Sequence, residues 1–202
     1  MDVPASVTVE VADDRTVFAP ESAEAGLIFY PGGKVEYTAY RPLMAELAKR
    51  DIFCVLLEMP LNLAVLDMDA AAGIPEQFPE VENWYLAGHS LGGSMAASFA
   101  GKQADTYDGL ILLAAYSTED LTETGLKVCS LYGDRDGVLN REKYEQYRQN
   151  LPEDTLELVL EDGNHAGFGS YGHQEGDGVS TLEAGAQIRW TADKILEFIQ
   201  EG

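Results

Sequence analysis

Short runs of consecutive apolar residues recur along the chain, and polar or amphipathic segments separate them. Most of these runs are apolar at every position instead of alternating, which is typical of strands buried on both faces of a parallel sheet. The runs occupy residues 27–30, 52–59, 84–87, 110–116, 128–132 and 156–160. We therefore expect a buried, mostly parallel sheet.

The segments between the runs often have the pattern of helices. Apolar residues recur at helical spacing in residues 42–50, in residues 141–151 and in the C-terminal stretch that contains Ile188, Ala192, Ile195 and Ile199. Residues 92–102 are mostly small, so a helix there is able to approach a sheet closely. Strands that alternate with helices predict an α/β three-layer sandwich with helices on both faces of the sheet.

Three further segments complete this layout. Residues 7–20 alternate with period two, which predicts an antiparallel hairpin at one edge of the sheet. Residues 117–127 are polar and too short for a substantial helical lid. Residues 60–80 are the longest irregular candidate, and we expect their apolar side chains to pack partly around the site. The length suits one domain over residues 1–202. Because segment 117–127 is short, we expect this domain to have little or no lid.

The chain is strongly acidic, with 13 Lys and Arg against 35 Asp and Glu and a formal charge of −22. Such a surface repels phosphate backbones and anionic lipids, so we expect no nucleic acid partner and no membrane contact from this chain. The simplest role of the acidic excess is to keep the protein soluble.

The sequence contains few signals that indicate localisation or redox state. The first residues, MDVPASVTVEV, lack the basic and long apolar parts of a signal peptide, and no run approaches the roughly 18 apolar residues of a transmembrane helix. We expect a cytoplasmic protein, or an extracytoplasmic one if an N-terminal anchor or signal has been removed. Cys54 and Cys129 lie inside apolar runs, so we expect buried free thiols.

The stretch GHSLGG at residues 88–93 combines a serine with glycines two positions before and after it. A nucleophilic serine on a sharp strand-to-helix turn needs small residues at those two positions. Here a strand candidate precedes the motif and a helix of small residues follows it. These neighbours favour Ser90 as a nucleophile over a turn that only serves packing.

A serine hydroxyl needs a base, and the base needs an acid to orient it. His89 adjoins Ser90 on a tight turn and points elsewhere, so we expect it to pack against neighbouring loops. His165, in the loop after the last strand, is the favoured base, and His173 is the second choice. For the acid, Asp136 in YGDRDG is favoured, which leaves Asp134 as a solvated loop residue.

The tetrahedral intermediate of such chemistry needs hydrogen-bond donors for its oxyanion. The backbone N–H after the nucleophile, that of Leu91, is one candidate. The second is expected after the strand at 27–30, where Pro-Gly-Gly-Lys lets the backbone approach a substrate. We assign it to the N–H of Gly33, with Lys34 as the alternative.

Several segments together resemble a known superfamily. From about residue 26 to the C-terminus the chain is similar to α/β-hydrolases, and Ser90, Asp136 and His165 follow one another in the order of that superfamily. The segments GLIFYPGGKVE, MPLNLAVLD, GHSLGG, DGLILLAAYS and GNHAGFGSYG look like a dienelactone-hydrolase-like bacterial family. Dienelactone hydrolases proper use a cysteine nucleophile, so Ser90 argues against their substrate. The resemblance also implies an N-terminal anchor or signal in many members.

These observations predict a serine hydrolase that cleaves small or short-acyl carboxylic esters through an acyl-enzyme, with a small-molecule ester as partner and no cofactor. A thioesterase, amidase, peptidase or deacetylase would use the same residues, and a non-catalytic binding protein on this scaffold is a further alternative. His173, Glu175 and Asp177 could suggest a metal site, but without a fixed two-histidine spacing we expect this loop to shape the pocket rim or hydrogen-bond the catalytic loop. The sequence leaves the oligomeric state open.

Overall fold

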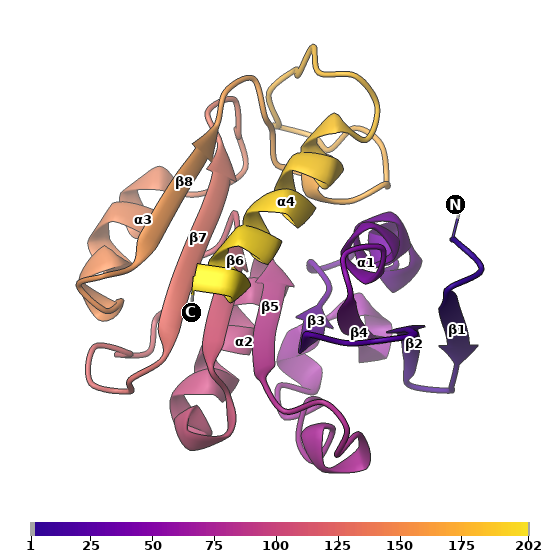
Figure 1. Cartoon of the computed structure of the whole chain (residues 1–202). Coiled ribbons are helices and arrows are strands. Elements are labelled where there is room, and N and C mark those ends of the chain that lie inside the picture. The colour runs from indigo at the N-terminus through magenta and orange to yellow at the C-terminus, as the bar shows by residue number, and fades with distance from the viewer. Residues whose placement is uncertain (1–2, 202) are drawn as a thin grey trace.

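The apolar runs form the strands of one eight-stranded sheet in the computed structural model, which describes residues 3–201 (Figure 1). The strand order is β1-β2-β4-β3-β5-β6-β7-β8. The strands β1 and β2 form an antiparallel hairpin at one edge, β2 runs antiparallel to β4, and the pairings from β4 to β8 are parallel. Their bounds are β1 Val7–Val11, β2 Arg15–Pro20, β3 Ala25–Tyr30, β4 Ile52–Leu57, β5 Trp84–His89, β6 Gly109–Leu113, β7 Lys127–Gly133 and β8 Leu156–Leu160.

Helices cover both faces of the sheet, as the alternating pattern predicts. The helices α1 (Arg41–Ala48) and α4 (Ala186–Glu201) lie together on one face, which is turned toward the viewer in Figure 1. The helix α2 (Leu91–Lys102) packs on the opposite face, where α3 (Arg141–Tyr147) is tied to β7 by a hydrogen bond of 2.8 Å between Tyr144 Oη and Ser130 Oγ. One buried apolar cluster fills the space under each layer. The three-layer α/β sandwich is therefore confirmed.

The ends of some strands differ from those expected from hydrophobicity. The run at 110–116 continues the strand pattern, but β6 ends at Leu113. The next residue, Ala114, has a left-handed φ of 47° and turns the chain away from the sheet. Likewise the run at 52–59 leaves the sheet after Leu57. Buried loop residues at the ends of strands are as apolar as the strands themselves, so hydrophobicity alone does not mark the boundary.

The segment 60–80 is irregular, with single 3-10 turns at Pro60–Asn62, Ala64–Leu66 and Pro75–Gln77. The buried Tyr30 anchors it, because the Tyr30 hydroxyl donates to the carbonyl of Met68 and accepts from the N–H of Ala71. Several of its apolar side chains join the cluster on the α2 face. No helix of the described residues forms a lid between β6 and β7.

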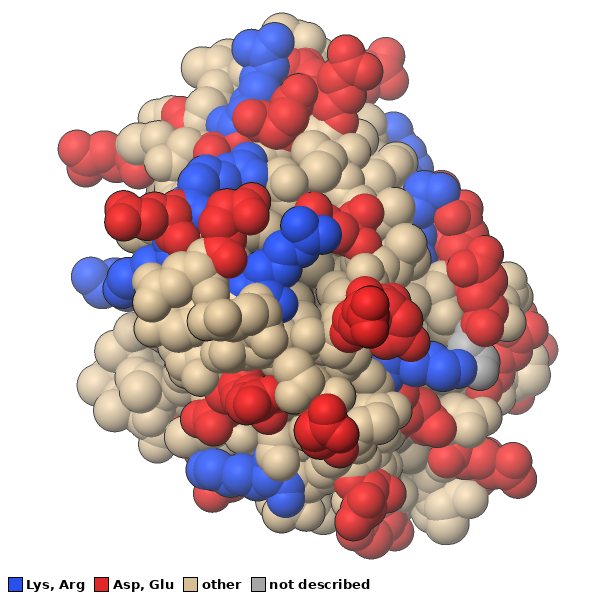
Figure 2. Space-filling view, turned by 90° about the vertical axis from the view of Figure 1, so that its left-hand side faces the viewer, with Lys and Arg blue, Asp and Glu red and all other residues tan. Residues whose placement is uncertain are grey.

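Acidic side chains are dispersed over one face of the molecule. On the face seen in Figure 2, red carboxylates lie among blue basic groups instead of forming one continuous patch. Between residues 3 and 201, the structure has no helix that is long and apolar enough to cross a membrane.

Candidate active site

Ser90 lies on the turn between β5 and α2, at the carboxyl edge of the sheet. Its backbone has φ 54° and ψ −124°, a conformation that non-glycine residues rarely adopt and that costs roughly 1–3 kcal/mol. A hydrogen bond of 2.9 Å from the Ser90 N–H to the Leu113 carbonyl holds this turn against β6. The strained strand-to-helix turn that GHSLGG predicts is therefore present.

The glycines of the motif are required by close backbone contacts. A Cβ atom on Gly88 would lie 2.6 Å from backbone atoms of Gly92 and Gly93, and one on Gly92 would overlap the carbonyl oxygens of Tyr30 and Pro31. Real Cβ atoms do not approach backbone that closely, so larger residues would force α2 away from the sheet. The small residues thus serve packing, and this packing creates the turn that raises Ser90.

His165 and Asp136 form a buried pair at the same edge. The Nδ1 atom of His165 lies 2.8 Å from Oδ2 of Asp136, and the two residues are 1% and 7% exposed. His165 follows β8, whereas Asp136 follows β7, so the parallel pairing of these strands brings the two loops together. The structure thus places the predicted base and acid in contact.

His165 and two backbone N–H groups stabilise the ionised form of Asp136. Its Oδ1 atom accepts hydrogen bonds from the N–H groups of Val138 (2.9 Å) and Leu139 (2.8 Å). Burial by itself would raise the pKa of the Asp136 carboxyl, but His165 and these two donors outweigh it and hold the pKa below its usual value. The alternative acid, Asp134, is exposed and accepts from the N–H of Asp162 instead.

Asp177 ties the loops of the pair to each other. Its Oδ1 accepts from the N–H groups of His165 (3.1 Å), Gly137 (3.2 Å) and Gly178 (2.9 Å), and its Oδ2 accepts from Ala166 (2.8 Å). The sequence predicts that this loop shapes the pocket rim or hydrogen-bonds the catalytic loop, in preference to forming a metal site. The observed hydrogen bonds hold the His165 loop in position. No group of three or more potential metal ligands occurs within residues 3–201.

The loop after β3 leaves one backbone donor without a partner. The N–H of Gly32 donates to Tyr40 Oη at 3.1 Å, and the N–H of Lys34 donates to the Asn62 carbonyl at 2.7 Å. The Gly33 N–H between them has no acceptor among the described residues, and Gly33 packs against the side chain of Leu91. The N–H of Leu91 begins α2, where the first donors have no partner within the helix.

A cavity of about 230 Å³ is lined by Ser90, Leu91 and His165, whereas Asp136 and Gly33 are not among its lining residues. Ser90 and His165 both line it, so the structure brings the nucleophile candidate and the base candidate to one space. The remaining wall is largely apolar and includes Leu91, Ala115, Val138 and Leu139. A small cavity of this kind accommodates a short apolar group.

The other two histidines lie outside this cavity. His89 is buried and turned toward Tyr40, with its Nδ1 atom 2.7 Å from the Tyr40 hydroxyl oxygen. Its ring also packs against the rings of His165 and Phe168, as expected for a packing residue. His173 is exposed on the glycine-rich loop. Tyr40 was not identified from the sequence, because nothing in its local pattern separates it from an ordinary core aromatic.

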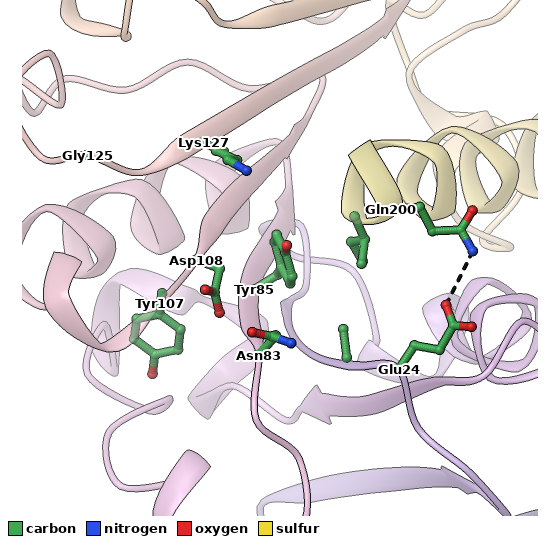
Figure 3. Close-up of a pocket in the computed structure, with 10 residues that line it drawn as sticks. Glu24, Asn83, Tyr85, Tyr107, Asp108, Gly125, Lys127 and Gln200 are labelled. Atoms are coloured by element: carbon green, nitrogen blue, oxygen red, sulfur yellow. Dashed lines mark hydrogen bonds between the residues drawn. The ribbon is translucent and has the colours of Figure 1, made fainter. Parts of the chain in front are cut away.

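A second cavity, of about 500 Å³, lies at the opposite ends of the parallel strands, where the strands begin (Figure 3). It is bordered by residues at or before the amino ends of the parallel strands, including Ala25, Asn83, Tyr85 and Asp108. Although it is larger, the residues that line it include no serine, cysteine or histidine. Size alone therefore does not select the cavity that contains the candidate residues.

Known structures show the same fold. Dienelactone hydrolase from Anabaena variabilis is 12% identical over 97% of this chain and 98% of that chain, with a TM-score of 0.71. The protein TT1662 from Thermus thermophilus is 16% identical over 96% and 97%, with a TM-score of 0.70. Est1E from Butyrivibrio proteoclasticus is 13% identical over 98% of both chains, with a TM-score of 0.68. At these identities the likeness concerns the fold.

The sequence itself gives the family. No curated protein sequence matches the chain. A sequence profile described as the alpha/beta hydrolase family, however, matches residues 26–189, which include β3 through the start of α4 and all the candidate residues above. The chain belongs to the alpha/beta hydrolase family.

Proposed function

We propose that this protein is a serine hydrolase that cleaves small carboxylic esters through an acyl-enzyme. One observation carries the proposal: a buried His165, bonded to the carboxylate of Asp136, lines the same small cavity as Ser90 on its strained turn. A protein that only bound ligands would have no need to combine a strained serine, a buried imidazole and a buried carboxylate.

In the proposed reaction, Ser90 Oγ attacks the ester carbonyl carbon while Nε2 of His165 takes the hydroxyl proton. Asp136 holds the other ring nitrogen and stabilises the imidazolium that forms. The N–H groups of Gly33 and Leu91 donate to the negatively charged carbonyl oxygen. The intermediate then expels the alcohol, which takes the proton from His165, and leaves the acyl group on Ser90.

Water completes the cycle by the same steps. His165 removes a proton from the water as its oxygen attacks the acyl carbon, and Ser90 leaves with that proton. The carboxylic acid is released and the enzyme returns to its starting state. No step requires a metal or a redox group.

The cavity supports a preference for short acyl chains. Its volume of about 230 Å³ and the absence of a helical lid between β6 and β7 within the described residues fit a small, accessible substrate. The apolar side chains around Ser90 suit an acyl group of few carbons. We expect p-nitrophenyl acetate and butyrate to be turned over much faster than the laurate.

A fluorophosphonate probe tests the nucleophile directly, because it reacts with an activated serine whatever the natural substrate. We expect labelling of the wild type and of Ser94→Ala but none of Ser90→Ala, whose ester turnover should fall by about 10⁶-fold. Ser94 is the matched control because it lines the same cavity, while its hydroxyl donates to the Tyr116 carbonyl. Full turnover by Ser90→Ala would disprove the assignment, and a panel of thioesters and amides would show whether esters are preferred.

A further inference from the structure

Two buried polar side chains next to the candidate site have no part in the proposed reaction. Tyr40, just before α1, and His89, at the end of β5, are 0% and 1% exposed. The N–H of Gly32 donates to Tyr40 Oη at 3.1 Å, and that oxygen lies 2.7 Å from His89 Nδ1. A continuous chain of contacts therefore joins the loop of Gly33 to the residue that precedes Ser90.

The direction of the hydrogen bonds in this chain follows from counting protons. A tyrosine hydroxyl has one proton, and its oxygen already accepts from Gly32. Among residues 3–201, the acceptor within reach of that proton is His89 Nδ1. The ring proton of His89 is therefore on Nε2.

Both groups are neutral at physiological pH. Burial, with a contribution from Tyr171, raises the pKa of Tyr40. Burial, together with the neighbouring His165, lowers the pKa of His89 well below its usual value. An uncharged His89 does not repel the imidazolium that forms on His165 in the proposed reaction.

At one end of this chain of hydrogen bonds, the peptide groups of Gly32 control the direction of the unpartnered Gly33 N–H. The Gly32 carbonyl accepts from the N–H of Val35 at 3.3 Å, and this carbonyl belongs to the same peptide group as the Gly33 N–H. Because a peptide group is planar and trans, its N–H points opposite to its C=O. The Gly32 N–H, held by Tyr40, fixes the preceding peptide, so the two bonds together set where Gly33 N–H points.

At the other end of this chain of hydrogen bonds, the ring of His89 packs against His165, the proposed base. The ring centroids of His89 and His165 are 4.5 Å apart, and those of His89 and Phe168 are 5.6 Å apart. We propose that Tyr40 and His89 act as a positioning pair, which holds the Gly33 donor and the His165 imidazole at a fixed spacing around Ser90. This inference rests on the proposed function, and it involves no proton transfer through the pair.

Tyr40→Phe tests the pair because it removes only the hydroxyl and keeps the ring that packs against Phe29. We expect kcat for p-nitrophenyl acetate to fall about tenfold with KM changed by less than about twofold, since a misdirected donor weakens transition-state stabilisation and not substrate binding. Tyr171→Phe is the matched control: its ring contacts the rings of Tyr40 and His89, but its hydroxyl donates to Gln174. We expect this control to retain wild-type kcat.

Substitutions at His89 separate hydrogen bonding from packing. Asn places an amide oxygen near the position of Nδ1 and preserves an acceptor for Tyr40, whereas Leu does not. We expect His89→Leu to lose about as much kcat as Tyr40→Phe, and His89→Asn to recover most of that loss. The double variant Tyr40→Phe/His89→Leu should be no slower than the slower single variant, because the residues act as one unit. If the kcat losses of the two single variants multiply in the double variant, the proposal of a positioning pair is overturned.

Amide exchange gives a readout that is independent of catalysis. We expect the Gly32 amide to exchange at least about tenfold faster in Tyr40→Phe than in the wild type or Tyr171→Phe, since its acceptor is lost. The unpartnered Gly33 amide serves as the internal reference. Unchanged exchange at Gly32 would overturn the positioning pair even if the enzyme is active. Faster exchange in a protein that no fluorophosphonate labels would instead sustain the contact and reject the proposed function.

Discussion

The two ends of the parallel strands are both hollowed, yet they differ in chemistry. The cavity at the amino ends is about 500 Å³ and is bordered by groups such as Asn83, Asp108 and Gln200 (Figure 3). The cavity at the carboxyl ends is about 230 Å³ and contains Ser90 and His165. The smaller cavity holds the proposed nucleophile and base, so the volume of a pocket did not decide which cavity we propose as the active site.

Backbone strain follows the same division. Most non-glycine residues with a left-handed φ come soon after the carboxyl end of a strand; they are Lys34 after β3, Leu61 and Asn62 after β4, Ser90 after β5, Ala114 after β6 and Asp162 after β8. Only Asp51, among the described non-glycine residues, has this conformation directly before a strand. A strained backbone of this kind costs of order 1–3 kcal/mol per residue, which the packed sheet must offset. Strain of this kind is typical of functional sites.

After the loss of Ser90 itself, removing the charge of Asp136 at the carboxyl end should produce the largest change in activity. Asp136→Asn keeps the size of the side chain, but it can no longer stabilise the imidazolium of His165. We expect kcat to fall about 10⁴-fold, measured with p-nitrophenyl acetate. Asp134→Asn, in the same loop, is the control and should change kcat by less than about threefold, because it contacts Asp162 instead. Equal losses in the two variants would mean that Asp136 is not the acid of the site.

Loosening the support behind the pair should have an intermediate effect. Asp177→Ala leaves the N–H groups of Gly137, His165 and Ala166 without their carboxylate acceptor. We expect kcat to fall about thirtyfold and the free energy of unfolding to fall by about 1–3 kcal/mol. Glu175→Gln, on the exposed part of the same loop, should match the wild type in both assays. An Asp177→Ala variant with normal kcat would show that the two loops keep their positions without this clamp.

The charge of Asp136 should also appear in the pH dependence of stability. Its pKa is lowered in the folded protein, so its ionised form stabilises the fold above the unfolded-state value of about 3.9, and this contribution is lost as the pH falls through the folded-state value. We expect the difference in unfolding free energy between wild type and Asp136→Asn, measured in urea, to be larger at pH 7 than at pH 3. A difference that stays constant between these two pH values would contradict an ionised, stabilised Asp136.

Much of the fold could be read from the sequence because buried parallel strands are apolar at every position. The strand at 156–160 is found as expected, and the turn at Ser90 was indicated by glycines whose need is steric. The end of β6 was placed too late because Ala114 and Ala115 are buried loop residues with strand-like hydrophobicity. Local pattern reports burial well, but it does not report the backbone angle at which a strand stops.

The contacts that organise the site were harder to predict. Ser90, Asp136 and His165 follow strand ends in an order that their chemistry makes recognisable. Tyr40 and His89 are 49 positions apart and meet only because β3 and β5 are neighbours in the sheet. The loop of Asp177 was expected to shape the pocket rim or hydrogen-bond the catalytic loop, but its exact contacts were not, because the backbone N–H groups that it binds have no sequence signature. Long-range contacts of this kind become visible once the sheet order is known.

The smallest effect is expected at the amino ends, and it tests whether the division between the two ends is real. Glu24 and Asn83 are exposed at the edge of that cavity, and Glu24 accepts a 3.3 Å hydrogen bond from Gln200 (Figure 3). These groups lie at the opposite ends of the strands from Ser90. Glu24→Gln and Asn83→Ala should therefore change kcat/KM by less than about twofold and leave fluorophosphonate labelling intact. A tenfold change from either substitution would show that the larger cavity is coupled to the reaction, and the carboxyl ends could then no longer be treated as the whole site.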